Sequence, residues 1–306
     1  MKVAVLYGGI SAEREVSLSS GKGIMEALKN KGHEVTGIDF HPERLHDVIQ
    51  LDVDIVYIAL HGRFGEDGKV QALLDLLGIP YVGSGVQGSA LALDKAKSKM
   101  FFEKEGTRVA KEQILMKHSF DEAAFTAELD FPIVVKPNLE GSTIGLTIAE
   151  DESTLMAGIK QAFEFDETIM LEEFISGIEV TVAVLGEKGE EKALPVIEIV
   201  PKNKYYDYEA KYAAGGSEHI IPARLSAEQT SYVQKHAVRA HQTLGCEVYS
   251  RVDFIVPKDE TQLPVILEVN TLPGMTPTSL FPDACKEVDL PYEEMVETLL
   301  QLSLKK

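Results

Sequence analysis

The first 90 residues alternate between short apolar strands and helices, and this alternation limits the possible folds more than any other feature of the chain. Strand-helix-strand units in this order form a parallel sheet with helices packed on its faces. Strands are expected at 2–7, 35–40, 54–60 and 81–83, and helices at 17–31 and 70–77. Ligands bind such sheets beyond the carboxyl ends of the strands. The Gly8-Gly9 turn and the loop beginning at His61 both follow strands, so we expect a binding site there.

The rest of the chain mixes strands and helices without this rhythm, which indicates α+β units after an α/β beginning. Helices are expected at 89–105, near 121–128, and at 152–163, 227–244 and 292–302. Strands are expected at 113–116, 133–136, 168–174, 180–185, 194–200, 249–256 and 265–270. A chain of 306 residues is long enough for two or three domains. We expect domains at 1–93, 94–178 and 179–306.

Two of these strands would bring acidic side chains together. Residues i and i+2 of a strand share a face, so Glu268 and Asn270 point the same way, as do Arg251 and Asp253. Paired as a hairpin across 257–264, the strands would place Asp253, Glu268 and Asn270 side by side. Three hard oxygen donors beside an arginine suit phosphate bound to Mg²⁺.

Two further segments are compatible with nucleotide binding. The loop 141–145 follows the strand that carries Lys136, and its backbone N–H groups and hydroxyls can cover phosphates while Lys136 supplies a point charge. It is not a P-loop, because no Gly-Lys-Ser/Thr opens a helix, and alone it could be an exposed turn. The segment 171–179 offers backbone groups to an adenine edge and Glu179 to ribose, or else it is a solvated acidic connector.

Three other segments have unusual composition. The loop 61–68 is dense in glycine and polar groups, which favours a functional loop over a plain connector. Segment 8–21 places charges in a loop just before a helix. The tyrosine-rich run 205–212 is expected to be a flap that orders on binding, the alternative being an exposed irregular loop. The other histidines are expected to face solvent or to pack: His33, His41, His46, His118, His219, His236 and His241.

The composition excludes several classes of partner. A net charge of -19 argues against nucleic acid and anionic membranes, which need a basic face, but it allows a local basic pocket for a small anion. The two cysteines, Cys246 and Cys285, lack metal-ligand spacing and fit a reducing compartment. No apolar run approaches the ~20 residues of a membrane span, and the run at 3–7 is too short for a signal peptide. We therefore expect a cytoplasmic protein.

The order of these features is more specific than any one of them. A lysine on a strand, a glycine-rich lid, an acidic hinge and then an Asp…Glu-x-Asn set together resemble the ATP-grasp superfamily. The finer resemblance is to the D-alanine–D-alanine ligases, and it runs from 8–18 (GGISAEREVSL) to 270–276 (NTLPGMT). It implies a three-domain architecture, in which an N-terminal Rossmann-like domain with a parallel sheet precedes two α+β domains that enclose ATP.

This resemblance implies a reaction and its cofactors. Two D-alanines would be joined to D-alanyl-D-alanine through D-alanyl phosphate, with release of ADP and phosphate, for peptidoglycan precursor synthesis. The cofactors would be ATP and two Mg²⁺ ions, for which Mn²⁺ could substitute, held by Asp253, Glu268 and Asn270. The family also implies a homodimer, with D-alanine as the partner and neither nucleic acid nor membrane.

The resemblance assigns a nucleotide site residue by residue. Lys95 and Lys136 would contact phosphates. Arg251 and the N–H of Gly274 would stabilise charge on the acyl phosphate and the oxyanion. The adenine and ribose positions are Glu172, Glu173, Phe174 and Glu179, and Glu173 departs from relatives that carry lysine there.

The amino-acid site is assigned in the same way. Glu13 would hold the first D-alanine ammonium, with His61 in the same pocket, and Lys211 and Ser279 would lie near the carboxylate of the second D-alanine. Glu13, Ser142 and Tyr212 match a hydrogen-bonded trio that closes the flap in relatives. Family members that make D-alanyl-D-lactate tend to carry phenylalanine in place of Tyr212, so tyrosine favours the dipeptide.

Two alternatives remain beside this function. The acceptor could differ, which would make the protein a D-alanyl-D-lactate or D-alanyl-D-serine ligase. The protein could instead be a nucleotide-binding regulatory or scaffold protein that keeps the fold without turnover. The complete metal set and the position of Arg251 argue against the second alternative.

Overall fold

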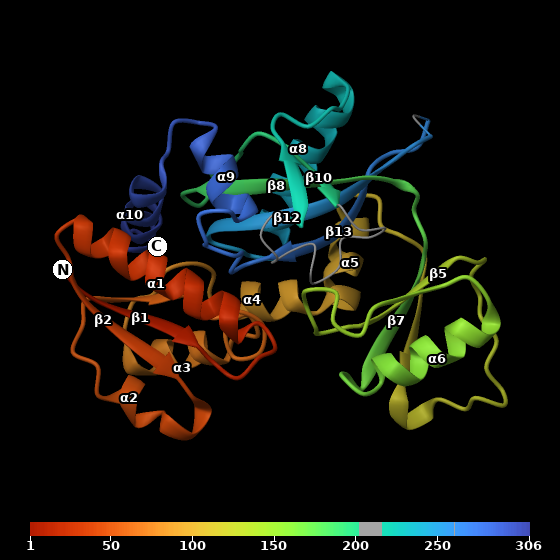
Figure 1. Ribbon diagram of the computed structural model, residues 1–306, viewed down its shortest axis with the longest axis horizontal. Helices are drawn as coiled ribbons and strands as arrows, with labels where there is room; N and C mark the ends of the chain where they lie inside the picture. The colour runs from red at the N-terminus through yellow and green to blue at the C-terminus, as the bar shows by residue number, and fades with distance from the viewer. Residues whose placement is uncertain (202–215, 260) are drawn as a thin grey trace.

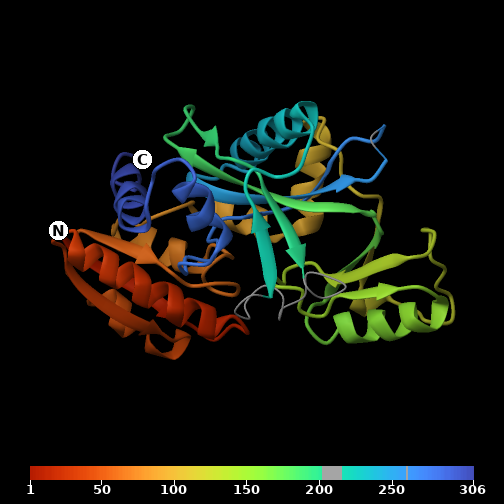
Figure 2. The same ribbon diagram turned by 45° about the horizontal axis from the view of Figure 1, so that its top comes forward.

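The computed structural model describes residues 1–201, 216–259 and 261–306. Three sheets organise these residues, each with its own helices (Figure 1). Figure 2 shows a parallel sheet and a four-stranded sheet at opposite ends of the molecule, with a six-stranded sheet between them. Both chain termini lie near the parallel sheet (Figure 1). No helix in the described ranges is both long enough and apolar enough to span a bilayer.

The N-terminal part forms the predicted parallel sheet, with strand order β2-β1-β3. Its strands are β1 (Lys2–Gly8), β2 (Glu34–Phe40) and β3 (Ile55–Ile58), and its helices are α1 (Arg14–Asn30), η1 (Pro42–Arg44), α2 (His46–Ile49) and α3 (Lys69–Leu77). The strand expected at 81–83 is reduced to one bridge between Tyr81 and Val56. The loops at Gly8 and His61 follow β1 and β3, so the expected binding edge is present.

The predicted helix at 89–105 is two helices, α4 (Val86–Leu93) and α5 (Lys95–Lys104). Asp94 separates them because its backbone is extended and its carboxylate accepts the N–H of Lys97 at 3.1 Å, which caps α5. Asn138 reinforces the break, since its amide bonds both the carboxylate of Asp94 and the N–H of Ala96. The break makes Lys95 the first residue of a helix, at the edge of a cleft.

The central part is a four-stranded antiparallel sheet in the order β4-β7-β5-β6. Its elements are β4 (Glu112–Met116), η2 (Lys117–Ser119), β5 (Ile133–Pro137), β6 (Thr147–Ala149), α6 (Glu152–Ala162) and β7 (Thr168–Glu173). The helix expected near 121–128 is wrong, because a turn at 122–124 and irregular chain occupy that segment. The Gln113 side chain bonds the carbonyl of Thr126 and the N–H of Glu128, so this N–H does not bond the carbonyl of Ala124 as it would in a helix.

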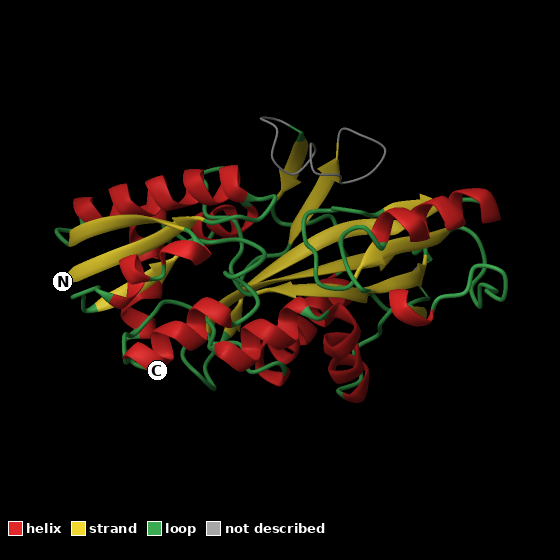
Figure 3. Ribbon diagram, turned by 90° about the horizontal axis from the view of Figure 1, so that it is seen from below, coloured by secondary structure: helices red, strands yellow, loops and turns green. Residues whose placement is uncertain are grey.

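The C-terminal part is a six-stranded sheet, with β9 beside β8 and the others in the order β11-β10-β8-β12-β13. Its strands are β8 (Gly177–Gly186), β9 (Lys192–Ala193), β10 (Ile197–Pro201), β11 (Ser217–Ile220), β12 (Val248–Pro257) and β13 (Val265–Asn270). Its helices are α8 (Ala227–Thr243), α9 (Leu280–Lys286) and α10 (Tyr292–Ser303), of which α9 was not expected from the sequence. Helices line one face of this sheet in Figure 3.

Three apolar cores hold these parts. One fills the central unit around Ile133 and Ile159, and another lies between α8 and the six-stranded sheet. The largest joins the parallel sheet to α9 and α10, so that Leu6 and Leu299 belong to one cluster. Both cysteines are buried and free, as core thiols. The shared core fixes the loops of the parallel sheet against the ends of β13 and α9.

Close helix packing supplies a test of this arrangement. A Cβ built on Gly88, in α4, would lie 2.5 Å from the carbonyl oxygen of Gly245. Alanine has a higher helix propensity than glycine by about 1 kcal/mol, but the clash is with backbone and cannot be relieved by a rotamer change. We expect Gly88→Ala to lower the free energy of unfolding by about 1–3 kcal/mol in a denaturant titration.

The matched control is Gly85→Ala at the start of the same helix. Its Cβ would meet side-chain atoms only at 3.6 Å, an ordinary contact. Because alanine is a poorer N-cap than glycine, this variant should lose at most about 1 kcal/mol, less than Gly88→Ala. Equal stability of the two variants would contradict the packing of α4 against Gly245.

Candidate active site

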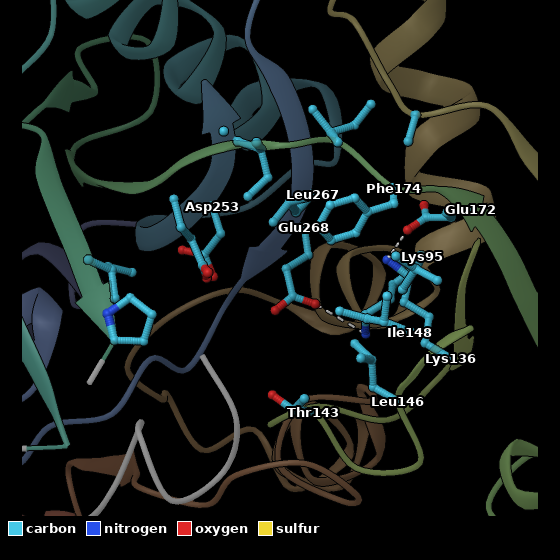
Figure 4. Close-up of a pocket in the computed structure, with 18 of the residues that line it drawn as sticks. Lys95, Lys136, Thr143, Leu146, Ile148, Glu172, Phe174, Asp253, Leu267 and Glu268 are labelled. Carbon is cyan, nitrogen blue, oxygen red and sulfur yellow. Dashed lines mark ion pairs between the residues drawn. The ribbon is translucent and has the colours of Figure 1, made fainter. Parts of the chain in front are cut away.

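Two adjoining cavities lie where the three sheets meet. The larger, of about 490 Å³, is bounded by the four-stranded and six-stranded sheets (Figure 4). The smaller, of about 60 Å³, is bounded by the N-terminal loops and by the segment after β13. The cavities share Gly141, Ser142 and Glu268. Every predicted site residue that the structure describes lines one of them, whereas Lys211 and Tyr212 lie outside the described residues.

The predicted hairpin is confirmed. Strands β12 and β13 pair antiparallel, with Arg251 opposite Asn270 and Asp253 opposite Glu268. The register shifts just after Asp253, where the ladder reaches Phe254. All four polar side chains therefore reach the cleft from neighbouring strands, and Asp253 and Glu268 are labelled in Figure 4.

The carboxylate of Asp253 is fixed from three sides. Arg251 donates to both of its oxygens, from Nε at 3.0 Å and from a terminal guanidinium nitrogen at 2.7 Å. Thr181, on β8, donates its hydroxyl at 2.5 Å, and Asn270 donates its amide at 3.1 Å. An amide that gives its nitrogen to Asp253 keeps its carbonyl oxygen as an acceptor or ligand.

The oxygen donors of Asp253, Glu268 and Asn270 suit a hard cation that takes only a few of its ligands from the protein. Within the described ranges, no group of three or more His, Cys, Asp or Glu side chains could hold a metal ion. Two carboxylates and an amide oxygen are what this site offers, from Asp253, Glu268 and Asn270. Mg²⁺ takes oxygen ligands, uses one or two carboxylates and completes its octahedron with water and phosphate, so these residues fit it.

Two lysines reach the larger cavity, and both form ion pairs with carboxylates that line it (Figure 4). Lys95 lies 3.2 Å from a carboxylate oxygen of Glu268 and also donates to the carbonyl of Glu140 at 2.7 Å. Lys136, on β5, pairs with Glu172 on β7. Burial alone would lower the pKa of Lys136, but the charge of Glu172 outweighs it and the pKa is raised.

Lys136 belongs to a cluster of four charges, in which Lys99 and Glu172 are buried and Glu112 and Lys136 are partly buried. Glu112 and Glu172 stand opposite each other on β4 and β7, where two like charges alone would repel. Lys99 pairs with both, and it is only 2% exposed. Burial would raise the pKa of Glu172, but Lys136 and Lys99 together hold it below its usual value.

Lys99 and Glu112 were not predicted as site residues. Lys99 follows Lys95 by four residues in α5, which places both on one helix face, and this spacing was the available signal. The position of Glu112 opposite Glu172 depends on the pairing of strands far apart in the sequence. In the larger cavity, Glu198 and Arg224 form another pair that was not predicted.

The smaller cavity is acidic on its N-terminal side. Glu13, at the start of α1, accepts a hydrogen bond from Ser142, which links the loop after β1 to the glycine-rich loop. Ser142 and Thr143 both adopt positive φ values, of 51° and 65°, so that loop is tightly bent. His61 contacts the carbonyl of Leu272 through Nδ1 at 2.9 Å and the hydroxyl of Ser20 through Nε2 at 3.3 Å.

His61 and Glu66 form a buried pair in this cavity, 3.9 Å apart. Burial would lower the pKa of His61, but Glu66 and Glu13 outweigh it and raise the pKa. The pKa of Glu66 is raised by burial and by Glu13, in spite of His61. Glu66 belongs to the loop singled out from the sequence, although only His61 was named there.

His219 departs from the sequence expectation that it would face solvent or pack. It lines the smaller cavity from β11, and its Nδ1 lies 2.7 Å from a carboxylate oxygen of Asp283 in α9. The residues are 64 positions apart, and α9 itself was not expected. No local pattern in the sequence could have found this pair.

A cleft between two antiparallel sheets, with lysines on one wall and an Asp-Glu-Asn set on the other, defines this protein as an ATP-grasp enzyme. Family models extend the assignment: one described as the D-ala D-ala ligase C-terminus matches residues 101–301, and one described as the N-terminus matches 41–84. The chain belongs to the D-alanine–D-alanine ligase family.

Individual relatives are similar in sequence to this chain over nearly its whole length. A D-alanine–D-alanine ligase of Halalkalibacterium halodurans is 71% identical over 306 residues, covering 100% of both chains. One from Citrifermentans bemidjiense is 47% identical, covering 98% of this chain and 95% of the relative.

Solved structures share the fold. A D-alanine–D-alanine ligase from Bacillus anthracis complexed with ATP superposes with a TM-score of 0.84 at 33% identity, covering 100% of this chain and 98% of that one. The VanG D-Ala:D-Ser ligase from Enterococcus faecalis gives a TM-score of 0.84 at 31% identity, covering 99% of each chain.

The buried charge cluster gives a stability prediction. Lys99→Met removes the cation between Glu112 and Glu172, which leaves the buried Glu172 and the partly buried Glu112 with too little compensation. We expect the free energy of unfolding to fall by about 3–5 kcal/mol, measured by chemical denaturation.

Lys97→Met is the matched control, because Lys97 lies on the same helix with an exposed side chain and pairs only at the surface with Asp94. Its effect should stay within about 1 kcal/mol. Comparable losses in both variants would contradict the account of the cluster.

Proposed function

We propose that the protein joins two D-alanines into D-alanyl-D-alanine using ATP, through D-alanyl phosphate, with release of ADP and phosphate. The observation that carries this proposal is that the two cavities adjoin and share Ser142 and Glu268 as lining residues. A phosphate bound in the larger cavity would meet an amino acid bound in the smaller one. The 71% identical relative is named for the same reaction, and a related structure holds ATP.

In this proposal the larger cavity binds ATP. Phe174 and the backbone beside Glu172 and Glu173 would contact adenine, while Glu179 would bind the ribose. Lys95 and Lys136 would turn from their carboxylate partners to the phosphates. When Lys136 does so, Lys99 still neutralises the buried Glu172. The site can therefore exchange one anion for another without leaving a buried charge unpaired.

We assign Asp253, Glu268 and Asn270 as the ligands of two Mg²⁺ ions. Mn²⁺ could replace these ions. The hard oxygen donors and the hold of Arg251 and Thr181 on Asp253 support this assignment. When bound, Mg²⁺ would neutralise phosphate charge and favour attack at phosphorus. It would take over the contact that Lys95 makes with Glu268.

The smaller cavity would position the amino acids. Glu13 would bind the ammonium of the first D-alanine, beside His61, so that its carboxylate oxygen meets the γ-phosphorus. The amine of the second D-alanine then attacks the acyl carbon, and the bond to the phosphate oxygen breaks. Arg251 and the N–H of Gly274 would stabilise the oxyanion between these steps. The glycine matters, because a Cβ there would lie 2.9 Å from the Ser279 hydroxyl.

Two of the assigned residues, Lys211 and Tyr212, lie outside the described residues. Lys211 and Ser279 would bind the carboxylate of the second D-alanine, and Tyr212 would join Glu13 and Ser142 to exclude water from the acyl phosphate.

We also propose domains at 1–93, 94–178 and 179–306, a cytoplasmic homodimer, and a role in peptidoglycan precursor synthesis without nucleic-acid or membrane partners. The three separate sheets and the net charge of -19 support the domain division and the lack of anionic polymer partners.

Product analysis tests the function. Purified protein with ATP, Mg²⁺ and equal D-alanine, D-serine and D-lactate at neutral pH should form mainly D-alanyl-D-alanine, together with ADP and phosphate. A preference for D-lactate or D-serine would replace the proposed acceptor. Absence of any D-alanine-dependent phosphate release would indicate a binding protein without turnover.

Glu268→Gln tests the junction of the two cavities. The change removes the carboxylate that both cavities share and that we assign to the metal. We expect kcat to fall at least about a hundredfold, while the thermal unfolding midpoint stays near wild type. Glu190→Gln, an exposed change of the same kind, should leave kcat unaltered. Near-normal kcat in Glu268→Gln would refute the metal assignment.

A further inference from the structure

A histidine–carboxylate pair stands at one end of the smaller cavity without a role in the reaction described above. His219 on β11 and Asp283 on α9 meet through Nδ1 and Oδ2 at 2.7 Å, and their side chains are 19% and 26% exposed. The other ring nitrogen of His219 lies 3.3 Å from the hydroxyl of Ser217. The pair joins an edge strand to a helix, yet His219 also lines the cavity.

The pair stands at the end of the cavity formed by the start of α9. Asp283 follows Ser279 by four residues, and its N–H bonds to the Ser279 carbonyl at 3.1 Å. Residues at this spacing share a helix face, so the partner of His219 lies one turn beyond Ser279. Ser279 and Leu280 line the cavity together with His219.

The charges of this cavity favour a role for His219 with an anion. Among its described lining residues, Glu13, Glu66 and Glu268 are acids, which disfavours a bound carboxylate unless a cation offsets them. Arg251 is committed to both oxygens of Asp253. Both ring nitrogens of His61 have buried partners, in Leu272 and Ser20, whereas Nε2 of His219 meets, in the described part of the chain, only the partly exposed hydroxyl of Ser217.

We propose that His219, oriented by Asp283, binds the carboxylate of the acceptor amino acid beside Ser279. The inference rests on the proposed function. It adds His219, and Asp283 as its partner, to the proposed acceptor site. In the imidazolium form both ring nitrogens donate. Nδ1–H is held by Asp283, and Nε2–H, now near the Ser217 hydroxyl, donates to the incoming carboxylate as a charge-assisted hydrogen bond.

This arrangement makes the acceptor carboxylate a condition for tight binding. The nucleophilic amine takes no part in the contact with His219, so the pair acts on acceptor selection and on the acceptor KM. Asp283 is a positioning residue, because it fixes the ring and does not itself reach the acceptor.

A competition between D-alanine and D-alaninamide as acceptors tests the proposal. The amide keeps the amine and the shape of D-alanine but lacks the carboxylate charge. With D-alanine as donor, wild type should form D-alanyl-D-alanine in large excess over D-alanyl-D-alaninamide, measured by mass spectrometry. His219→Ala should reduce this preference about tenfold or more, because it removes a charged hydrogen bond. The D-alaninamide rate should be unchanged.

Asp283→Asn is the second variant, since it conserves shape and should reduce the preference in the same direction. His118→Ala, at an exposed histidine on η2, is the control and should match wild type. An unchanged product ratio in His219→Ala, or an equal loss of both products in both variants, would overturn the inference. Failure of wild type to form either product would instead refute the proposed function.

Discussion

The register of β12 between β8 and β13 is the constraint on which the rest of the active site depends. It sets Arg251 opposite Asn270 and Asp253 opposite both Glu268 and Thr181. The alternate residues Val252 and Phe254 are fully buried in the core under α8. A slip of one residue would exchange these two sets of side chains. The hydrophobic core and the polar cleft therefore specify the same pairing.

The charges of the cleft follow a second constraint, which is that buried ions must keep partners. Lysines and carboxylates that line the cleft neutralise one another, through Lys95 with Glu268 and, within the four-stranded sheet, Lys136 with Glu172. Nucleotide phosphates would compete for the same lysines. Lys99 keeps Glu172 paired whether Lys136 contacts Glu172 or a phosphate. Stability and ligand binding are thus linked through one buried carboxylate.

Sequence reasoning found the features that depend on local periodicity. The parallel sheet and the β12–β13 hairpin follow from strand patterns, and the loop after β3 from its position. It failed where side-chain hydrogen bonds compete with a regular helix: Gln113 bonds Thr126 and Glu128 in the segment 121–128, and Asp94 with Asn138 divides α4 from α5. The Lys99–Glu172 and His219–Asp283 pairs join residues 73 and 64 positions apart, and such contacts have no local signature.

The central claim is that one continuous site transfers phosphate to a D-alanine carboxylate and then replaces that phosphate with an amine. The most direct measurement uses D-alanine labelled with ¹⁸O in its carboxylate. The attacking oxygen becomes the bridge of the acyl phosphate and leaves with phosphorus, so one labelled oxygen should appear in inorganic phosphate for each dipeptide formed. Label found in AMP, or phosphate released without label alongside dipeptide, would contradict the account.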